Sequence, residues 1–310
     1  MPVFRVVPGG YDEDMLSYLH GFHAGNAADV LKHSALVFCL TYLKKKETPI
    51  LCVDTHAGAG AYNLSGTAFP RNQEWEKGIG RLLRTGGKET AGALPPMITD
   101  YLRFCIGPRG EYSGSPVIMA RVLNDIAPQR GDRLVCFELH PREFETLKAS
   151  LEEVRREGGL AAEVRREDGP GGLKALLPPP SRRGLVLIDP SWEEQSEYES
   201  IPRTVREGLR RFPGGTFIVW YPLLFRAKET GAAPVQDILF DLSGGKRCRV
   251  ELCVRAAEKL PPDSPRGMYG SGLVLYNPPW TLRAALEETL PRLTEILDDG
   301  GGSWRLEWRE

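Results

Sequence analysis

The 310-residue sequence predicts an α/β fold in which helices cover both faces of a mainly parallel, seven-stranded sheet. Short apolar runs typical of buried strands alternate with longer segments whose apolar residues recur at helical spacing. Several of these runs end in a glycine turn or an acidic residue. No apolar run reaches the roughly 18 residues needed to span a membrane. The strands are expected at 50–53, 133–138, 161–166, 184–188, 215–221, 247–255 and 271–276.

The first predicted helix covers residues 27–46, and Pro49 separates it from the first strand. The run 44–46 consists of lysines, which suit the negative C-terminal end of that helix. Residues 62–112 are polar, mostly helical in pattern and interrupted by glycines, which indicates a small helical insertion. We therefore expect one domain over 15–310, preceded by a disordered extension at 1–14.

Composition and charge limit the function classes. Hydrophobic residues at 41% and charged residues at 26% are typical of a globular protein. The net charge of −1 lacks the basic excess expected of a nucleic-acid binder, although residues 203–228 hold six basic side chains and one acid. A solvated helix face explains that cluster equally well.

Cysteine and histidine usage predicts no metal site. The six cysteines form no CxxC pair and read as small buried residues in a reducing compartment. His20 and His23 lie close together in the sequence, but no cysteine or carboxylate spacing accompanies them. The N-terminal sequence has no secretory pattern, so we expect a cytoplasmic protein without a membrane partner.

Ligands of such sheets bind at the carboxyl ends of the strands, so the residues there indicate function. After the first strand, Gly58 and Gly60 allow a sharp turn and a close approach of the backbone to a ligand. The turn lacks a P-loop lysine, and Asn63 stands where a dinucleotide motif has its third glycine. S-adenosylmethionine has no phosphate and needs only the tight turn and nearby polar groups.

Two further strand ends carry acids suited to the same cofactor. Glu138 ends the second strand and can accept hydrogen bonds from both ribose hydroxyls. Asp168, followed by Gly169, can accept a bond from the adenine amino group. His56 lies inside the glycine turn, which must contact the cofactor. Taken singly, each could be an ordinary surface or turn residue.

The fourth strand ends in Asp189-Pro190-Ser191-Trp192, which resembles the (D/N)PP(Y/F/W) signature of amino-group methyltransferases. The nitrogen lone pair of an aromatic amine is delocalised into the ring, so the amine is a poor nucleophile. A carboxylate, Asp189, and a backbone carbonyl, that of Pro190, can accept its two hydrogens and orient it for attack. Trp192 would stack on a base flipped out of its helix. Ser191 departs from the signature, which has a second proline there.

A second match, Asn277-Pro278-Pro279-Trp280, follows the signature more literally. Chain order argues against it, because the catalytic motif is expected after the fourth strand and Asn277 follows the last one. We therefore assign catalysis to Asp189.

In combination, these motifs resemble the RlmJ family of bacterial methyltransferases, which make N6-methyladenosine in the 23S ribosomal RNA of the large subunit. The resemblance covers residues 15–310. It rests on residues 15–33, 54–60, 114–116, 138–141, 168–169, 181–190, 220–222, 266–268, 271–272 and 277–280.

The resemblance implies a Rossmann-like class I S-adenosylmethionine-dependent methyltransferase. Asp189 would be the catalytic proton acceptor and Tyr18 would contact the RNA substrate. The implied partner is 23S ribosomal RNA or a ribosomal precursor, and we expect a monomer. Read alone, a helical histidine such as His33 is more often a structural group. The implied cofactor-binding residues are His33, His56, Ser115, Glu138, Asp168 and Gly169.

Two other function classes stay open. The first is a methyltransferase of the same fold that acts on DNA or a small amine. The second is a non-catalytic nucleic-acid-binding protein, including one involved in the use of external DNA.

Overall fold

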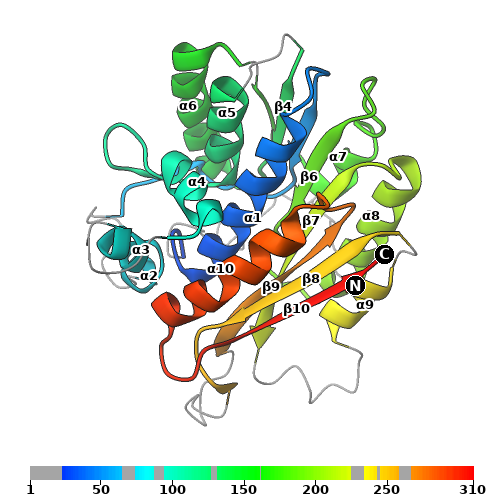
Figure 1. Cartoon of the computed structure of the whole chain (residues 1–310). Coiled ribbons are helices and arrows are strands. Elements are labelled where there is room, and N and C mark those ends of the chain that lie inside the picture. Colours follow the sequence, from blue (N-terminus) through cyan, green and yellow to red (C-terminus); the bar gives the residue numbers. More distant parts are fainter. Residues whose placement is uncertain are drawn as a thin grey trace, which may run out of the picture.

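The computed structural model describes residues 23–64, 74–86, 94–126, 131–160, 162–224, 234–242, 245–257 and 267–310. A central eight-stranded sheet within these residues has the order β10-β8-β9-β7-β6-β1-β4-β5 (Figure 1). Its strands are β1 (Leu51–Asp54), β4 (Arg133–Phe137), β5 (Ala162–Arg165), β6 (Gly184–Ile188), β7 (Thr216–Leu224), β8 (Arg247–Cys253), β9 (Met268–Tyr276) and β10 (Ser303–Arg309).

The strands of this sheet are parallel on one side of β7 and include antiparallel pairs on the other. The pairs β1–β4, β1–β6, β4–β5 and β6–β7 are parallel. Strand β9 is antiparallel to both β7 and β8, so β8 runs with the parallel set, whereas β9 and β10 run against it. The carboxyl ends of β1, β4, β5 and β6 therefore meet at one edge, where ligands of such sheets bind.

Helices cover both faces of the sheet (Figure 1). Alternate residues of each strand join opposite cores: Cys52 packs with the helices of one face and Val53 with those of the other. The first face carries α1 (Ala27–Leu43), α3 (Ile79–Gly86), α4 (Pro96–Cys105), α5 (Ser115–Asp125), α6 (Pro141–Gly158) and α10 (Leu282–Leu297). The second carries α7 (Gly169–Leu173), α8 (Glu197–Arg211) and α9 (Val235–Asp241). Burial on both sides explains why β1 and β6 read as continuous apolar runs.

The predicted fold class is confirmed, and each of the seven predicted strands lies within a few residues of an observed one. The eighth strand, β10, was not predicted. It is an edge strand paired to β8 alone, and its Ser-Trp-Arg-Leu-Glu-Trp-Arg sequence is largely polar and exposed. Nothing in that pattern separates a solvated edge strand from a loop.

The segment proposed as an insertion, 62–112, is described in part. It holds α2 (Glu74–Lys77), α3 and α4, and a ladder of β2 (Ala61–Tyr62) with β3 (Tyr112–Ser113) joins its two ends. The extension proposed at 1–14 lies outside the described residues. Among the described helices, none has the length and apolar character required to cross a bilayer.

A buried ion pair connects the end of α1 to the beginning of the sheet. Lys44 does not simply close α1, as the sequence suggested: its ammonium pairs with Asp132, and the two side chains are 1% and 2% exposed. The other carboxylate oxygen of Asp132 accepts the Ile50 backbone N–H at 2.9 Å. This pair therefore links the end of α1 to the starts of β1 and β4.

We expect Lys44→Met to lower the free energy of unfolding by about 3–5 kcal/mol, because it removes the ammonium that pairs with a buried carboxylate. Lys46→Met is the matched control, since Lys46 belongs to the same lysine run but is exposed. Urea unfolding of both variants measures the difference. Equal, small losses for the two would contradict the structural role of Lys44.

Candidate active site

The carboxyl edge of the sheet holds a cavity of about 300 Å³, here named the turn cavity. The turn that follows β1, the end of β4 and the loop before α7 surround it, and the loop after β6 closes it. Its lining includes Thr55, His56, Gly58, Tyr62, Ser115, Phe137, Glu138, Asp168, Gly169, Asp189, Ser191 and Glu197.

The glycine turn and Glu138 form one unit. Gly58 has a φ of +61°, a left-handed backbone that glycine adopts without strain. Its N–H donates to one carboxylate oxygen of Glu138 at 2.8 Å, and the His140 N–H donates to the other at 2.7 Å. Burial raises the pKa of Glu138 above its ordinary value. Each oxygen retains a lone pair that can accept another hydrogen bond.

Asp168 and Gly169 close the opposite side of the turn cavity. Asp168 is the N-cap of α7, and one of its carboxylate oxygens accepts the Gly171 N–H at 2.7 Å. A Cβ on Gly169 would lie 2.1 Å from the backbone oxygen of Thr55. Glycine is therefore required there to bring the loop against the turn after β1.

A buried carboxylate directly precedes the turn that lines the turn cavity. Asp54 is fully buried, and its pKa is raised to about 6, mainly by burial; a hydrogen bond from Ser115 opposes that shift and the nearby Asp189 adds to it. Next to it, burial lowers the pKa of His56 to about 4, so this imidazole is neutral at pH 7. The Nδ1 atom of His56 lies 2.8 Å from the hydroxyl of Thr55.

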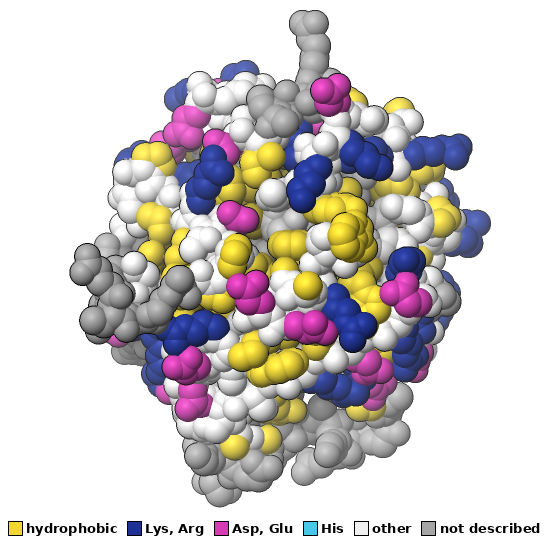
Figure 2. Space-filling model, in the orientation of Figure 1, with side chains coloured by type: hydrophobic (Ala, Val, Ile, Leu, Met, Phe, Trp, Pro, Cys, Tyr) yellow, Lys and Arg dark blue, Asp and Glu magenta, His cyan; other side chains and the backbone are white. Residues whose placement is uncertain are grey.

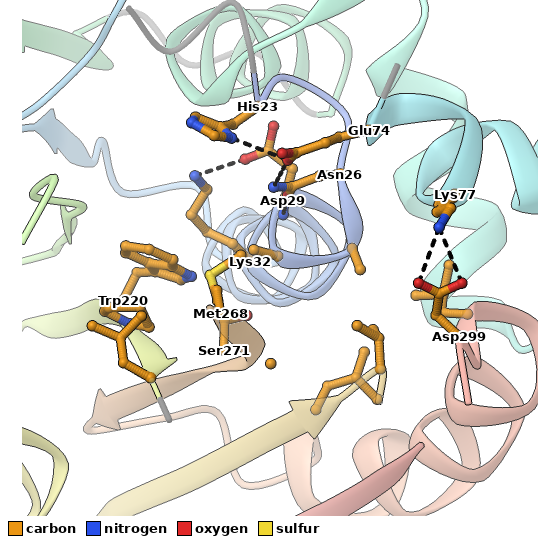
Figure 3. Close-up of a pocket in the computed structure, with 18 of the residues that line it drawn as sticks. His23, Asn26, Asp29, Lys32, Glu74, Lys77, Trp220, Met268, Ser271 and Asp299 are labelled. Carbon is orange, nitrogen blue, oxygen red and sulfur yellow. Dashed lines mark hydrogen bonds and ion pairs between the residues drawn. The ribbon is translucent and has the colours of Figure 1, made fainter. Parts of the chain in front are cut away.

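A second cavity of about 710 Å³ lies beside the first and is named the α1 cavity (Figure 3). Helix α1 provides one wall, and residues of β7, β8 and β9 provide the facing one. Its rim is polar: Glu74 accepts bonds from His23 and Asn26, both at 3.0 Å, and Lys77 pairs with Asp299. The pair with Glu74 raises the pKa of His23.

Asp189 lines both cavities. It follows β6, and its Oδ2 accepts a bond of 2.5 Å from the Lys32 ammonium. Lys32 also pairs with Asp29 at 2.8 Å, one helical turn earlier in α1. All three side chains are at most 10% exposed. A single ammonium thus lies between two carboxylates at the boundary of the two cavities.

Trp192 is held more tightly than the sequence suggested. It is 5% exposed, its indole N–H donates to the Trp220 backbone oxygen at 3.0 Å, and it packs edge-on against Tyr198. Its φ is +57°, a strained conformation for a bulky residue. The part of Trp192 that is exposed faces the α1 cavity.

Not every predicted site residue lines a cavity. His33 is 1% exposed, its Nδ1 lies 2.8 Å from the Tyr112 hydroxyl, and it lines neither cavity. Gly60, with a φ of +81°, has no room for a Cβ beside Leu147. Pro190, in the loop after β6, is buried, and Tyr18 lies outside the described residues.

The literal motif match lies far from this site. Because β9 is antiparallel to β7, its end is level with the start of β7, and the Thr216 hydroxyl donates to the Asn277 backbone oxygen at 3.1 Å. The Asn277 side chain caps the backbone oxygens of Pro213 and Gly215. Asn277 is thus a structural residue at the opposite edge of the sheet from Asp189.

Sequence analysis missed Lys32, Asp29 and Asp54. A carboxylate and a lysine spaced i,i+3 on a largely apolar helix were the available signal for the first two. The second partner of Lys32, Asp189, is 157 residues away in the sequence and could not be inferred from it.

Comparison with known proteins decides the family. The family model described as ribosomal RNA large subunit methyltransferase D, RlmJ, matches residues 47–310. The chain belongs to the RlmJ family. Two relatives are both called ribosomal RNA large subunit methyltransferase J. The one from Haemophilus influenzae is 38% identical over 302 residues, covering 95% of this chain and 99% of the relative. The one from Escherichia coli is 35% identical over 303 residues, with the same coverage.

A solved structure has the same fold. Protein LPL1258 from Legionella pneumophila superposes with a TM-score of 0.77 at 31% identity, covering 92% of this chain and 98% of that protein. The fold that the two proteins share therefore extends over 92% of this chain.

The names of both relatives refer to ribosomal RNA, whereas one face of this chain presents mixed charge. On the face in Figure 2, lysine and arginine side chains lie among aspartate and glutamate side chains. The arginine cluster of α8 is also partly compensated, because Glu207 pairs with both Arg210 and Arg211. Arg203 and Arg206 of the same helix are exposed.

The lowered pKa of His56 predicts a pH-dependent stability difference. Below pH 6.5 the unfolded chain protonates this histidine, while the folded one keeps it neutral down to about pH 4. We therefore expect the wild type to lose about 1–2 kcal/mol relative to His56→Gln between pH 7 and pH 5. Urea unfolding of both proteins at both pH values measures this. Parallel pH profiles would show that His56 is not held neutral.

Proposed function

We propose that this chain transfers a methyl group from S-adenosylmethionine to the N6 atom of an adenine in 23S ribosomal RNA. One observation carries the proposal: Asp189 lies on the wall shared by two cavities. The turn cavity would hold the cofactor and the α1 cavity the flipped adenine, so donor and acceptor would meet at Asp189. The names of the RlmJ relatives support ribosomal RNA as the substrate.

The residues of the turn cavity fit the cofactor. Glu138 is anchored by two backbone N–H groups and can accept both ribose hydroxyls. Gly58 and Gly169 let the backbone approach closely from two sides. Asp168 can accept a bond from the adenine amino group, and neutral His56 and Ser115 line the remainder. Carboxylates around the turn cavity favour a positively charged sulfonium.

The chain's own residues would orient and deprotonate the amine. When bound, S-adenosylmethionine supplies an electrophilic methyl group. Lys32 occupies Oδ2 of Asp189, which leaves Oδ1 free to accept one N6 hydrogen. The Pro190 carbonyl would accept the other hydrogen, as in the methyltransferase signature. The methylated nitrogen then loses a proton to Asp189 or water. Positioned acceptors of this kind stabilise the charge that develops during transfer.

Lys32 would hold a positive charge against Asp189 during this reaction. Burial lowers the pKa of the ammonium, but Asp189 and Asp29 outweigh burial and raise it, so Lys32 stays charged. Asp29 in turn holds Lys32 in place through the i,i+3 pair.

On the substrate side, the exposed part of Trp192 would contact the flipped base, and Tyr18 would contact RNA near the entrance. We propose a monomer that works in the cytoplasm without a metal.

The direct test supplies purified protein with labelled cofactor and one of three substrates: 23S ribosomal RNA, DNA or a small aromatic amine. Nuclease digestion and mass spectrometry should find N6-methyladenosine in the RNA alone. Methylation of DNA or the amine instead would favour the first alternative. Tight nucleic-acid binding without cofactor binding in calorimetry would favour the non-catalytic one. Mapping of ribosomal RNA from cells that lack the protein would then locate the adenine.

We expect Asp189→Ala to lower the rate of methyl transfer by about 10²- to 10³-fold, since an acceptor acting in the transition state is lost. The fold should persist, because Lys32 still pairs with Asp29. Asn277→Gly, which preserves the left-handed backbone at the other signature match, should keep the rate within a few-fold. Single-turnover assays compare the two variants. The reverse ranking would assign catalysis to Asn277.

We expect Lys32→Met to slow transfer by about 10²-fold or more, because Asp29 and Asp189 then face each other without a cation. Lys148→Met is the matched control: it removes another i,i+3 lysine–acid pair, which is exposed on α6. Thermal melting separates a loss of fold from a loss of rate. Wild-type turnover in a folded Lys32→Met protein would remove Lys32 from the mechanism.

A further inference from the structure

Ser191 stands where the methyltransferase signature has its second proline. A proline ring would fix φ at that position, and serine provides no such restraint. The loop after β6 is nevertheless held by hydrogen bonds. The Ser191 hydroxyl donates to Oε2 of Glu197, the first residue of α8, at 3.3 Å.

The same carboxylate contacts the loop at other points. Oε2 of Glu197 also accepts the Glu194 N–H at 3.3 Å, and the carboxylate interacts with the Trp192 backbone N–H. The Ser191 oxygen accepts the Glu193 N–H at 3.4 Å. Glu197 thus contacts the loop on both sides of Trp192, whose left-handed φ of +57° needs support from its surroundings.

We propose that the Ser191–Glu197 hydrogen bond replaces the missing second proline and holds the loop in the geometry that presents Asp189 and the Pro190 carbonyl. This inference rests on the proposed function of that loop. Glu197 is a positioning residue: it acts through Ser191 and the loop backbone.

A direct cofactor contact is the competing explanation, because Glu197 also lines the turn cavity. The two explanations differ in what they change. Loss of a positioning residue lowers the rate of transfer and leaves cofactor affinity nearly intact. Loss of a cofactor contact weakens binding, and no change at Ser191 restores it.

The loop permits a restoring substitution. Within the described part of the chain, the Ser191 backbone N–H donates no hydrogen bond. Ser191→Pro therefore removes no backbone bond there and supplies the ring that the signature has. If the proposal holds, Glu197 should matter much less once that ring is present.

The experiment is a double-mutant cycle of wild type, Glu197→Ala, Ser191→Pro and the double variant. We expect Glu197→Ala to lower the single-turnover rate on 23S ribosomal RNA by about 10- to 100-fold, since small displacements of reacting groups have effects of that size. In the Ser191→Pro background the same change should cost less than about 3-fold. Calorimetry should find S-adenosylmethionine affinity within about 3-fold in all four proteins.

Three further variants sharpen the result. Glu197→Gln keeps an acceptor oxygen and should retain most of the rate. Glu199→Ala removes an exposed acid from the same first turn of α8 and controls for the charge near the helix N-terminus. Ser191→Ala removes the hydroxyl alone and should reproduce the loss, which keeps the test valid if Glu197→Ala does not fold.

Equal losses from Glu197→Ala in both backgrounds, or a parallel loss of cofactor affinity, would overturn the proposal. Failure of the proposed function is distinguishable, because the wild type would then transfer no methyl group. In that case hydrogen exchange over residues 189–197 still tests the loop across the same cycle. Glu197→Ala should speed exchange there, and Ser191→Pro should suppress the increase. Unchanged exchange would refute the role of Glu197.

Discussion

The ion pair between Lys32 and Asp189 is the contact on which the arrangement of the site depends. A buried ammonium is costly unless it is paired, and here two carboxylates surround it. To satisfy Lys32, helix α1 must cross the end of β6 closely enough for a bond of 2.5 Å. That crossing creates the wall between the two cavities. The pairing of the buried Lys32 ammonium and the position of the Asp189 carboxylate therefore depend on the same contact.

The charged side chains at the site are paired with one another, independently of the net charge of the surface. The Lys32 ammonium pairs with the carboxylates of Asp29 and Asp189, and the nearby Asp54 interacts electrostatically with Lys32 and Asp189 and has a pKa raised to about 6, mainly by burial. Burial makes each of these charges sensitive to its neighbours, since screening by water is weak there. A net charge near zero, with both signs mixed on the face in Figure 2, is compatible with such a site. Arg203 and Arg206 of α8 are exposed, and within the described part of the chain neither forms a salt bridge with the Glu207 carboxylate that pairs with Arg210 and Arg211.

Sequence alone predicted what is encoded locally. The buried strands and the glycine turn could be recognised because a few consecutive residues define each of them. Strand β10 was missed because an exposed edge strand has no apolar alternation strong enough to identify it. Lys44 was correctly placed at the end of α1, but its buried partner Asp132 was missed, because that contact joins residues far apart in the sequence. The pairing of Lys32 with Asp189 could not be predicted either, because these two residues are also far apart in the sequence.

The two signature matches show that strand direction decides what a motif can do. Asn277-Pro278-Pro279-Trp280 agrees better with the signature, but β9 runs against its neighbours and delivers Asn277 to the edge remote from the turn cavity. Asp189 follows a strand parallel to β1, so it arrives beside the glycine turn. A departure such as Ser191 can be compensated by one hydrogen bond to the next helix. A local hydrogen bond cannot move a residue to the other end of a strand. Strand direction therefore restricts where the site can lie more strongly than exact agreement with the signature sequence does.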